Sequence, residues 1–144
     1  MILGVNFSKL IADRINNNAT GSININNNIK INEIKESKIF TAKGDKALEI
    51  EFEFTSKYEP SIAQIIIIGT AIYVNKEKAS KDILKEWEKD KKISEKYVEE
   101  ILSALLMKAN VEAVLLSKEI NVPPPIPMPR VGKNGNDGDN SYIG

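Results

Sequence analysis

The chain has 144 residues, a length that suits one domain with a real core, and twenty basic side chains balance twenty acidic ones. Zero net charge argues against nucleic acid as a partner, because proteins that bind it normally carry a basic excess or stripe. Cysteine and histidine are both absent, which excludes disulfides and thiol catalysis and removes the usual general base and the commonest metal ligand.

The opening residues, MILGVNFSKLIADR, do not read as an export signal, because no long apolar core follows a basic region. The uninterrupted apolar run at residues 65–68 is far too short to cross a bilayer. The sequence therefore predicts a soluble cytoplasmic protein without membrane insertion.

The first element has two interpretations. Five apolar residues share one parity, as they would in a strand: Leu3, Val5, Phe7, Ile11 and Ile15. Part of the same set also fits one face of a helix that begins near Ser8. We favour the strand, and the asparagines and glycine of residues 16–21 then favour a turn.

A second strand is expected from Ser22 onward, where isoleucines alternate with polar residues up to Ile31. The apolar parity then moves to Ile34. A change of phase inside a regular strand is what one inserted residue produces, so we expect a β-bulge near Asn32 to Ile34. A turn is expected over residues 42–46.

Residues 47–58 form the clearest strand, because apolar and polar side chains alternate strictly. The apolar side holds Leu48, Ile50, Phe52 and Phe54, and the polar side holds Glu49, Glu51, Glu53 and Thr55. One face should be buried and the other wet. Proline at position 60 predicts a short turn, so the next strand should run antiparallel to this one.

The strand expected over residues 62–74 is apolar on both faces. One side carries Ile65, Ile67 and Tyr73, and the other carries Ile62, Ile66, Ile68, Ile72 and Val74. A small domain usually covers one face of an antiparallel sheet. The second face must therefore be covered by more of the same chain, another copy or a partner.

The period becomes helical after residue 74. Ser80 and Ser94 are each followed closely by an acidic residue, which predicts two helix starts. The first helix is expected over residues 80–92, with Trp87 on its apolar side. The second is either one long helix or two helices with a break near Asn110.

The prolines at 123–125 must end the helix, because proline lacks the amide donor and clashes with a helical backbone. Residues 123–130 are either a polyproline ligand for an aromatic groove or a rigid connector that lies back along the domain, which we favour. We expect one domain over residues 1–131 and a disordered tail over 132–144.

No group of residues predicts catalysis. Glu49, Glu51 and Glu53 have neighbours about 7 Å apart, near the separation of some hydrolase carboxylate pairs, but a solvated strand surface is the commoner arrangement. Asp137 and Asp139 lack the glutamate that closes a calcium loop. We expect no enzyme, no cofactor and no bound metal.

The order of these elements resembles the SecB family of export chaperones over residues 29–131. ALEIEFEFTSKY and IAQIIIIGTAIYV look like the third and fourth strands of that family. VEEILSALLMKANVEAVLLSKEI is similar to its helical pair, with Asn110 near the junction, and INVPPPIPMPRV looks like its Pro-Pro exit. Unlike the strongly acidic bacterial members, this chain is neutral.

The resemblance implies an α+β fold, in which a four-stranded antiparallel sheet carries C-terminal helices on one face. It also implies a homotetramer, assembled as a dimer of dimers. The activity it implies is ATP-independent holding of unfolded polypeptides in long apolar grooves, in the service of protein export.

We therefore hypothesise a SecB-like chaperone that binds non-native polypeptide clients through apolar grooves. The side chains expected to contact the client are Phe52, Phe54, Ile65, Ile67, Tyr73 and Trp87. The alternative is a homo-oligomeric interaction module with one dedicated folded partner, captured through residues 123–130.

Overall fold

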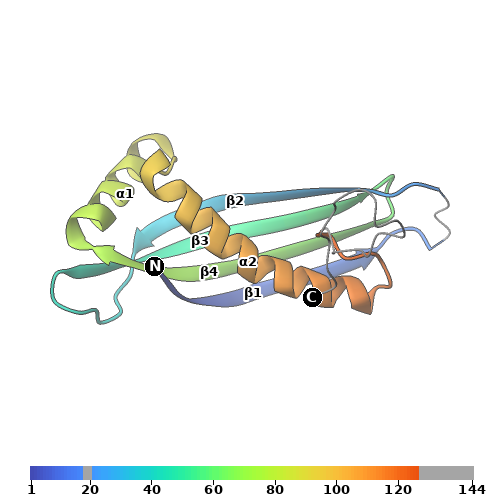
Figure 1. The fold of residues 1–144 in the computed structure, drawn as a ribbon, viewed down its shortest axis with the longest axis horizontal. Helices are drawn as coiled ribbons and strands as arrows, with labels where there is room; N and C mark the ends of the chain where they lie inside the picture. Colours follow the sequence, from blue (N-terminus) through green and yellow to red (C-terminus); the bar gives the residue numbers. More distant parts are fainter. Residues whose placement is uncertain (18–20, 127–144) are drawn as a thin grey trace, which may run out of the picture.

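The computed structural model describes residues 1–17 and 21–126 (Figure 1). Its elements are β1 (Ile2–Arg14), β2 (Asn24–Glu36), β3 (Asp45–Glu59), β4 (Ala63–Lys76), α1 (Glu77–Asp90) and α2 (Glu95–Glu119). The strands form one antiparallel sheet in the order β1-β4-β3-β2. Helix α2 crosses this sheet diagonally and α1 lies at one end, so the expected α+β architecture is confirmed.

The first element is a strand, which confirms the favoured interpretation, but its side chains do not keep one parity. A β-bulge lies between Phe7 and Lys9 in the pairing of β1 with β4. Val5 and Phe7 pack against the core, whereas Ile11 lies opposite Ile66 on the other face of the sheet. The predicted common face is wrong, because the inserted residue reverses the alternation.

The bulge expected in β2 is confirmed. The register between β2 and β3 shifts between Ile31 and Glu33, so Asn32 is the extra residue. Ile31 and Ile34 can therefore both face the helices although their sequence parity differs, since they lie opposite Phe52 and Ile50.

The two faces of the sheet differ in cover. The covered face lies under the helices, and its central residues are fully buried: Leu48, Ile50, Phe52, Phe54, Ile65, Ile67, Ala71 and Tyr73. The open face carries Glu49, Glu51, Glu53, Ile66, Ile68, Ile72 and Val74. Among the described residues no helix packs on the open face, and its β4 residues are half-buried.

Alternation predicts Ile62 on the open face beside Ile66, and this is wrong. Ile62 is buried in the core cluster. It precedes the first residue of β4 and follows Ser61, whose backbone has a positive φ of 49°. The turn therefore redirects this side chain before the regular alternation of β4 begins.

The two expected helix starts have different outcomes. Ser94 caps α2, because its side chain accepts a hydrogen bond from the Lys96 amide. Ser80 does not cap α1, which begins at Glu77. Ser80 lies buried within that helix, and its hydroxyl donates to the Lys46 carbonyl of β3 at 3.0 Å.

Helix α2 runs without a break through Asn110, so of the two alternatives the structure shows one long helix. The residues that face the sheet around this point are small: Ala109, Ala113 and Ser117 are all buried. Small side chains let one continuous helix lie close to the sheet, and this packing outweighs the weak helix propensity of a single asparagine.

The segment after α2 lies back along the sheet, which confirms the favoured interpretation for its described part. The Tyr58 hydroxyl donates to the Pro123 carbonyl and the Asn27 side-chain amide donates to the Pro125 carbonyl, each at 2.6 Å. Pro125 is buried. The tail expected over residues 132–144 lies outside the described residues.

Candidate functional site

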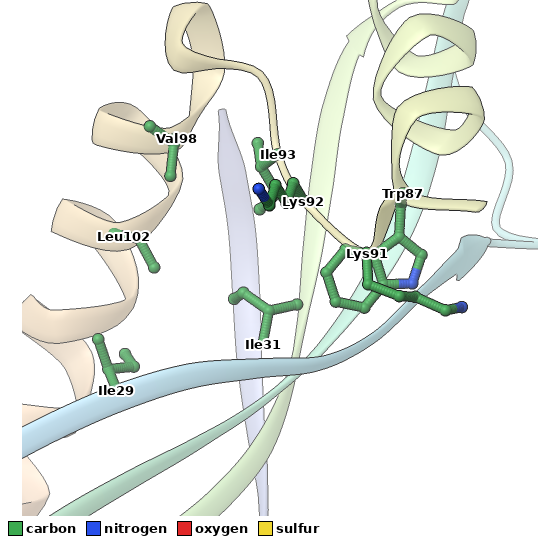
Figure 2. A pocket seen from close by; sticks show the side chains of 8 residues that line it. All are labelled: Ile29, Ile31, Trp87, Lys91, Lys92, Ile93, Val98 and Leu102. Atoms are coloured by element: carbon green, nitrogen blue, oxygen red, sulfur yellow. The ribbon is translucent and has the colours of Figure 1, made fainter. Parts of the chain in front are cut away.

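An open apolar depression lies where β2, the end of α1 and the start of α2 meet (Figure 2). Its volume is about 190 Å³. We call it the β2 groove, and its lining residues are Ile29, Ile31, Trp87, Lys91, Lys92, Ile93, Val98 and Leu102. Six of these side chains are apolar or aromatic, and the two charged ones are lysines.

Strand β2 supplies one wall of the groove and is an edge strand. Ile29 and Ile31 lie opposite Phe54 and Phe52, so their side chains are on the covered face. Both are only half-buried, because within residues 1–17 and 21–126 β2 has a neighbouring strand on one side alone. An edge strand presents unpaired backbone donors and acceptors along its free side.

Trp87 forms the wall at the end of α1, and two contacts orient its side chain. Its indole Nε1 donates to the Glu33 carboxylate at 3.2 Å. The Lys91 ammonium lies 5.4 Å from the indole centroid, and the Lys91 amide donates to the Trp87 carbonyl, which ends the helix. Trp87 is 5% exposed, so only the edge of the indole reaches the groove.

The remaining wall comes from α2 and from the connection between the helices. The Ser94 cap begins α2 beside Ile93, and Val98 and Leu102 follow one helical turn apart on the side that faces β2. Both are half-buried. The groove can therefore bury a small number of apolar side chains, and among the described residues Lys91 and Lys92 are the charged ones that line it.

No protein-family model matches the chain, and no curated protein matches its sequence. Among solved structures, the chain is similar to the Mycobacterium tuberculosis Rv1957 SecB-like chaperone in complex with a ChAD peptide from the Rv1956 HigA1 antitoxin. The TM-score is 0.51 at 9% identity, over 93% of this chain and 91% of that one. The fold is SecB-like.

Only Trp87 of the six residues predicted to contact a client lines the β2 groove of this SecB-like fold. The other five, Phe52, Phe54, Ile65, Ile67 and Tyr73, lie in the core with no exposed surface. In the protomer they form the packed layer that supports the groove walls. Their contact with a client stays a prediction.

The sequence reasoning missed five apolar residues of the groove: Ile29, Ile31, Ile93, Val98 and Leu102. One signal was available for Ile29 and Ile31. They alternate with polar residues along a strand that the sheet order places at an edge, so their apolar side has less cover than that of a central strand.

Helix α2 carries a second apolar surface on the side away from the sheet. Met107, Val111 and Leu115 follow one another every four residues and are 70%, 59% and 54% exposed. We call this set the outer stripe. A helix that is apolar on two opposite sides is typical of a helix packed between two layers.

Two buried tyrosines have strongly raised pKa values. Burial raises the pKa of Tyr58 to about 12, and burial likewise raises that of Tyr73 to about 12. The Tyr73 hydroxyl donates to Glu100 and accepts from the Asn75 amide. Both phenols stay protonated at neutral pH and act as hydrogen-bonding core residues.

Within residues 1–17 and 21–126, no cluster of three or more carboxylates could hold a metal ion. In the same part of the chain, neither helix is long and apolar enough to cross a membrane.

Proposed function

We propose that the protein is an ATP-independent chaperone that holds non-native polypeptides, with client side chains in the β2 groove. The observation that carries this proposal is an open apolar groove beside a free strand edge. Holding a chain needs accessible apolar surface with charged surroundings, and it needs no catalytic group. The SecB-like fold supports the proposal, as does the peptide bound to the similar mycobacterial protein.

The groove and the strand edge fit an extended client. A strand that adds to the free side of β2 would gain backbone hydrogen bonds whatever its sequence. Alternate side chains of such a client point to one face, and apolar ones would enter the groove against Ile29 and Ile31. This combination explains recognition of non-native chains in general rather than of one sequence.

The proposal includes a homo-oligomer in which the outer stripe of α2 packs against a second copy. Three neighbouring apolar side chains that are each more than half exposed are costly to leave in water. A dimer of dimers, a cytoplasmic location and a role in export stay predictions from the sequence.

Light scattering of a denatured, aggregating client tests the proposal. The wild-type protein should suppress aggregation near a stoichiometric ratio of oligomer to client. The double variant Val98→Lys with Leu102→Lys should lose this suppression, because it places two charges in the groove wall.

A matched control puts two lysines on the opposite edge of the sheet. Leu3→Lys with Leu10→Lys changes two exposed residues of β1. This variant should suppress aggregation as the wild type does. Equal activity of the groove variant and the wild type, or equal loss in both variants, would contradict the assignment of the groove.

The second candidate, a module with one folded partner, is favoured by a different observation. Pro123 and Pro125 are held by Tyr58 and Asn27, so the exit segment has a fixed path that a partner could recognise. Residues 127–130, which this candidate also needs, lie outside the described residues. Tight capture of a single folded protein without any suppression of aggregation would favour this candidate.

A further inference from the structure

The loop between β2 and β3, residues 37–44, projects from the end of the sheet beside the start of α1 (Figure 1). Two large apolar side chains lie at its tip: Phe40 is fully exposed and Ile39 is 43% exposed. Phe40 is the most exposed of the large apolar side chains that the structure describes. An aromatic ring has much apolar area to remove from water, so an apolar environment outside the protomer would gain most at this tip.

Hydrogen bonds hold the base of this loop in place. The Ser37 amide donates to the Ala47 carbonyl at 2.9 Å. The Thr41 hydroxyl donates to the Asp45 carbonyl, also at 2.9 Å. The Gly44 carbonyl accepts from the first amide of α1 at 3.0 Å. The loop therefore presents its two apolar side chains from a braced base, and little ordering is needed before they bind.

The charges around the tip are unevenly compensated. Three acidic residues at this end of the sheet each form an ion pair with a lysine: Glu36 with Lys46, Asp45 with Lys76, and Glu77 with Lys81. Lys38 and Lys43 flank the two apolar residues and are exposed. Within residues 1–17 and 21–126 neither of them forms an ion pair. A chain of zero net charge therefore carries uncompensated positive charge at this point.

A depression at the same end of the sheet adds to this positive charge. Its volume is about 530 Å³, and among the described residues its charged lining is Lys76, Lys78, Lys96 and Asp82. It lies beside the loop, because Lys76 is opposite Asp45 in the sheet and pairs with it at 2.7 Å. Even with Lys76 paired, the lining keeps one lysine more than its single acid can offset.

We propose that the tip of loop 37–44 binds the surface of a membrane that contains anionic lipids. Ile39 and Phe40 enter the boundary between the headgroups and the acyl chains, and Lys38 and Lys43 lie against lipid phosphates. In such peripheral contacts the burial of apolar area and the attraction of lysines to anionic lipids add to each other. The protein touches this surface and does not cross it.

The small size of the tip favours a lipid surface over a protein partner. A specific protein interface covers about 800 Å² on each partner, and two side chains at the end of a loop supply only a fraction of that area. A bilayer needs no complementary pocket to receive them. The β2 groove of a second copy is a poor receptor, because its Lys91 and Lys92 would repel Lys38 and Lys43.

Co-sedimentation of the full-length protein with vesicles measures this binding. Vesicles of phosphatidylcholine mixed with phosphatidylglycerol should bind the wild type, and vesicles of phosphatidylcholine alone should bind it about tenfold more weakly or less. Ile39→Ser with Phe40→Ser should weaken binding to the mixed vesicles by about tenfold or more, because it removes the apolar contribution. Lys38→Gln with Lys43→Gln should weaken it by on the order of tenfold and reduce its dependence on salt.

The matched control is Leu10→Ser with Ile15→Ser, which removes two exposed apolar side chains toward the opposite end of the sheet. This variant should bind the mixed vesicles as the wild type does. Unchanged binding by the 39/40 variant, or an equal loss in the control, would overturn the proposal. Equally tight binding of the wild type to both kinds of vesicle would overturn the role of the lysines.

A fluorescent label tests whether the tip itself enters the lipid. The chain has no cysteine, so a single introduced thiol can be labelled specifically. Ile39→Cys, carrying an environment-sensitive dye, keeps Phe40 in place. Its emission should shift to the blue when mixed vesicles are added, and the same dye on Ile15→Cys should not respond. No shift at position 39, or an equal shift at both positions, would contradict insertion of the tip.

Client aggregation separates this inference from the proposed function, on which it does not rest. The 39/40 variant should suppress aggregation as the wild type does. If it loses suppression and still binds vesicles, the tip belongs to the client surface and the lipid proposal fails. If the wild type binds neither kind of vesicle but captures one protein that the 39/40 variant loses, the tip serves a protein partner and the lipid proposal is again overturned.

Discussion

Strands β3 and β4 lie side by side and share a fully buried face, yet their other faces have opposite chemistry. On the open face Glu53 lies opposite Ile68, and Glu49 lies opposite Ile72. The covered face is uniform because helices exclude water from both strands. The open face changes from charged residues on β3 to apolar residues on β4.

This difference shows how one chain can partly shield the apolar residues that β4 places on the open face. Glu49 and Glu53 are held across the sheet by ion pairs to Lys35 and Lys30 of β2. Long charged side chains can lay their hydrocarbon stems over apolar neighbours while their charged ends stay in water. The open-face isoleucines of β4 are half-buried, and within residues 1–17 and 21–126 no helix packs above them.

The sharpest test of the comparison uses two adjacent isoleucines of β4. Ile67→Ala removes a fully buried side chain and should lower the free energy of unfolding by about 2–5 kcal/mol. Ile68→Ala, on the half-buried open face, should cost only about 1 kcal/mol because less apolar surface is lost from burial. Urea denaturation of both variants measures the difference, and equal losses would mean that something covers the open face too.

Two glycines provide the next test. A Cβ at Gly69 would lie 2.8 Å from the Asn6 carbonyl oxygen and 3.1 Å from the Phe52 ring, so Gly69→Ala should cost about 1–3 kcal/mol. Gly4 lies opposite Ile72, and a Cβ there would meet nothing within 4 Å. Gly4→Ala should therefore be neutral or slightly stabilising in thermal denaturation. A larger loss at Gly4 than at Gly69 would reverse the comparison.

The covered face should also be sensitive to alkaline pH. Burial raises the pKa of Tyr73 to about 12 from an ordinary value of 10.0, so the folded state keeps a proton that the unfolded state releases. Stability should be unaffected by this group below pH 10 and should fall as the pH rises from about 10 to about 12. Tyr73→Phe should show a shallower fall over that window when unfolding is followed by circular dichroism. Parallel curves for the variant and the wild type would contradict the role of burial.

The smallest loss of stability is expected when a charged residue of the open face is neutralised. The Lys30–Glu53 and Lys35–Glu49 pairs have nitrogen–oxygen distances of 3.6 and 3.4 Å, and both lysines are well exposed. Glu53→Gln should lower stability by less than about 1 kcal/mol, and added salt should reduce even that difference. A loss as large as that of Ile67→Ala would mean that these carboxylates do more than shield their neighbours.

Much of the fold follows from local patterns in the sequence. The alternation of β3, the bulge at Asn32, the cap at Ser94 and the end of α2 before the prolines were all predictable, because each depends on a few adjacent residues. The bulge in β1 was not, since Ser8 lies in a region where strand and helix patterns overlap. The continuity of α2 depends on its packing against the sheet, which no local pattern contains.

The groove was harder to predict than the fold. An apolar pattern predicts which side chains are buried, but the path of α2 across the sheet determines which of them are covered completely. Phe52 and Phe54 lie beneath this cover, whereas Ile29 and Ile31 lie at its margin on an edge strand. Trp87 was predicted as a contact residue from the excess of apolar surface over what two helices can cover, and it is the one of the six that lines the groove.

The position of β1 has a consequence for the synthesis of the chain. It is made before the other strands, yet its partner is β4, with Arg14 opposite Ala63 and Ile2 opposite Tyr73. At a translation rate of roughly 5–20 residues per second, the ribosome needs several seconds to deliver that partner. During this interval the β2–β3 hairpin can form, because its strands are close in sequence. Strand β1 has no strand to pair with over the same period, so its apolar side chains stay exposed. We expect the nascent chain itself to need protection from aggregation until β4 emerges.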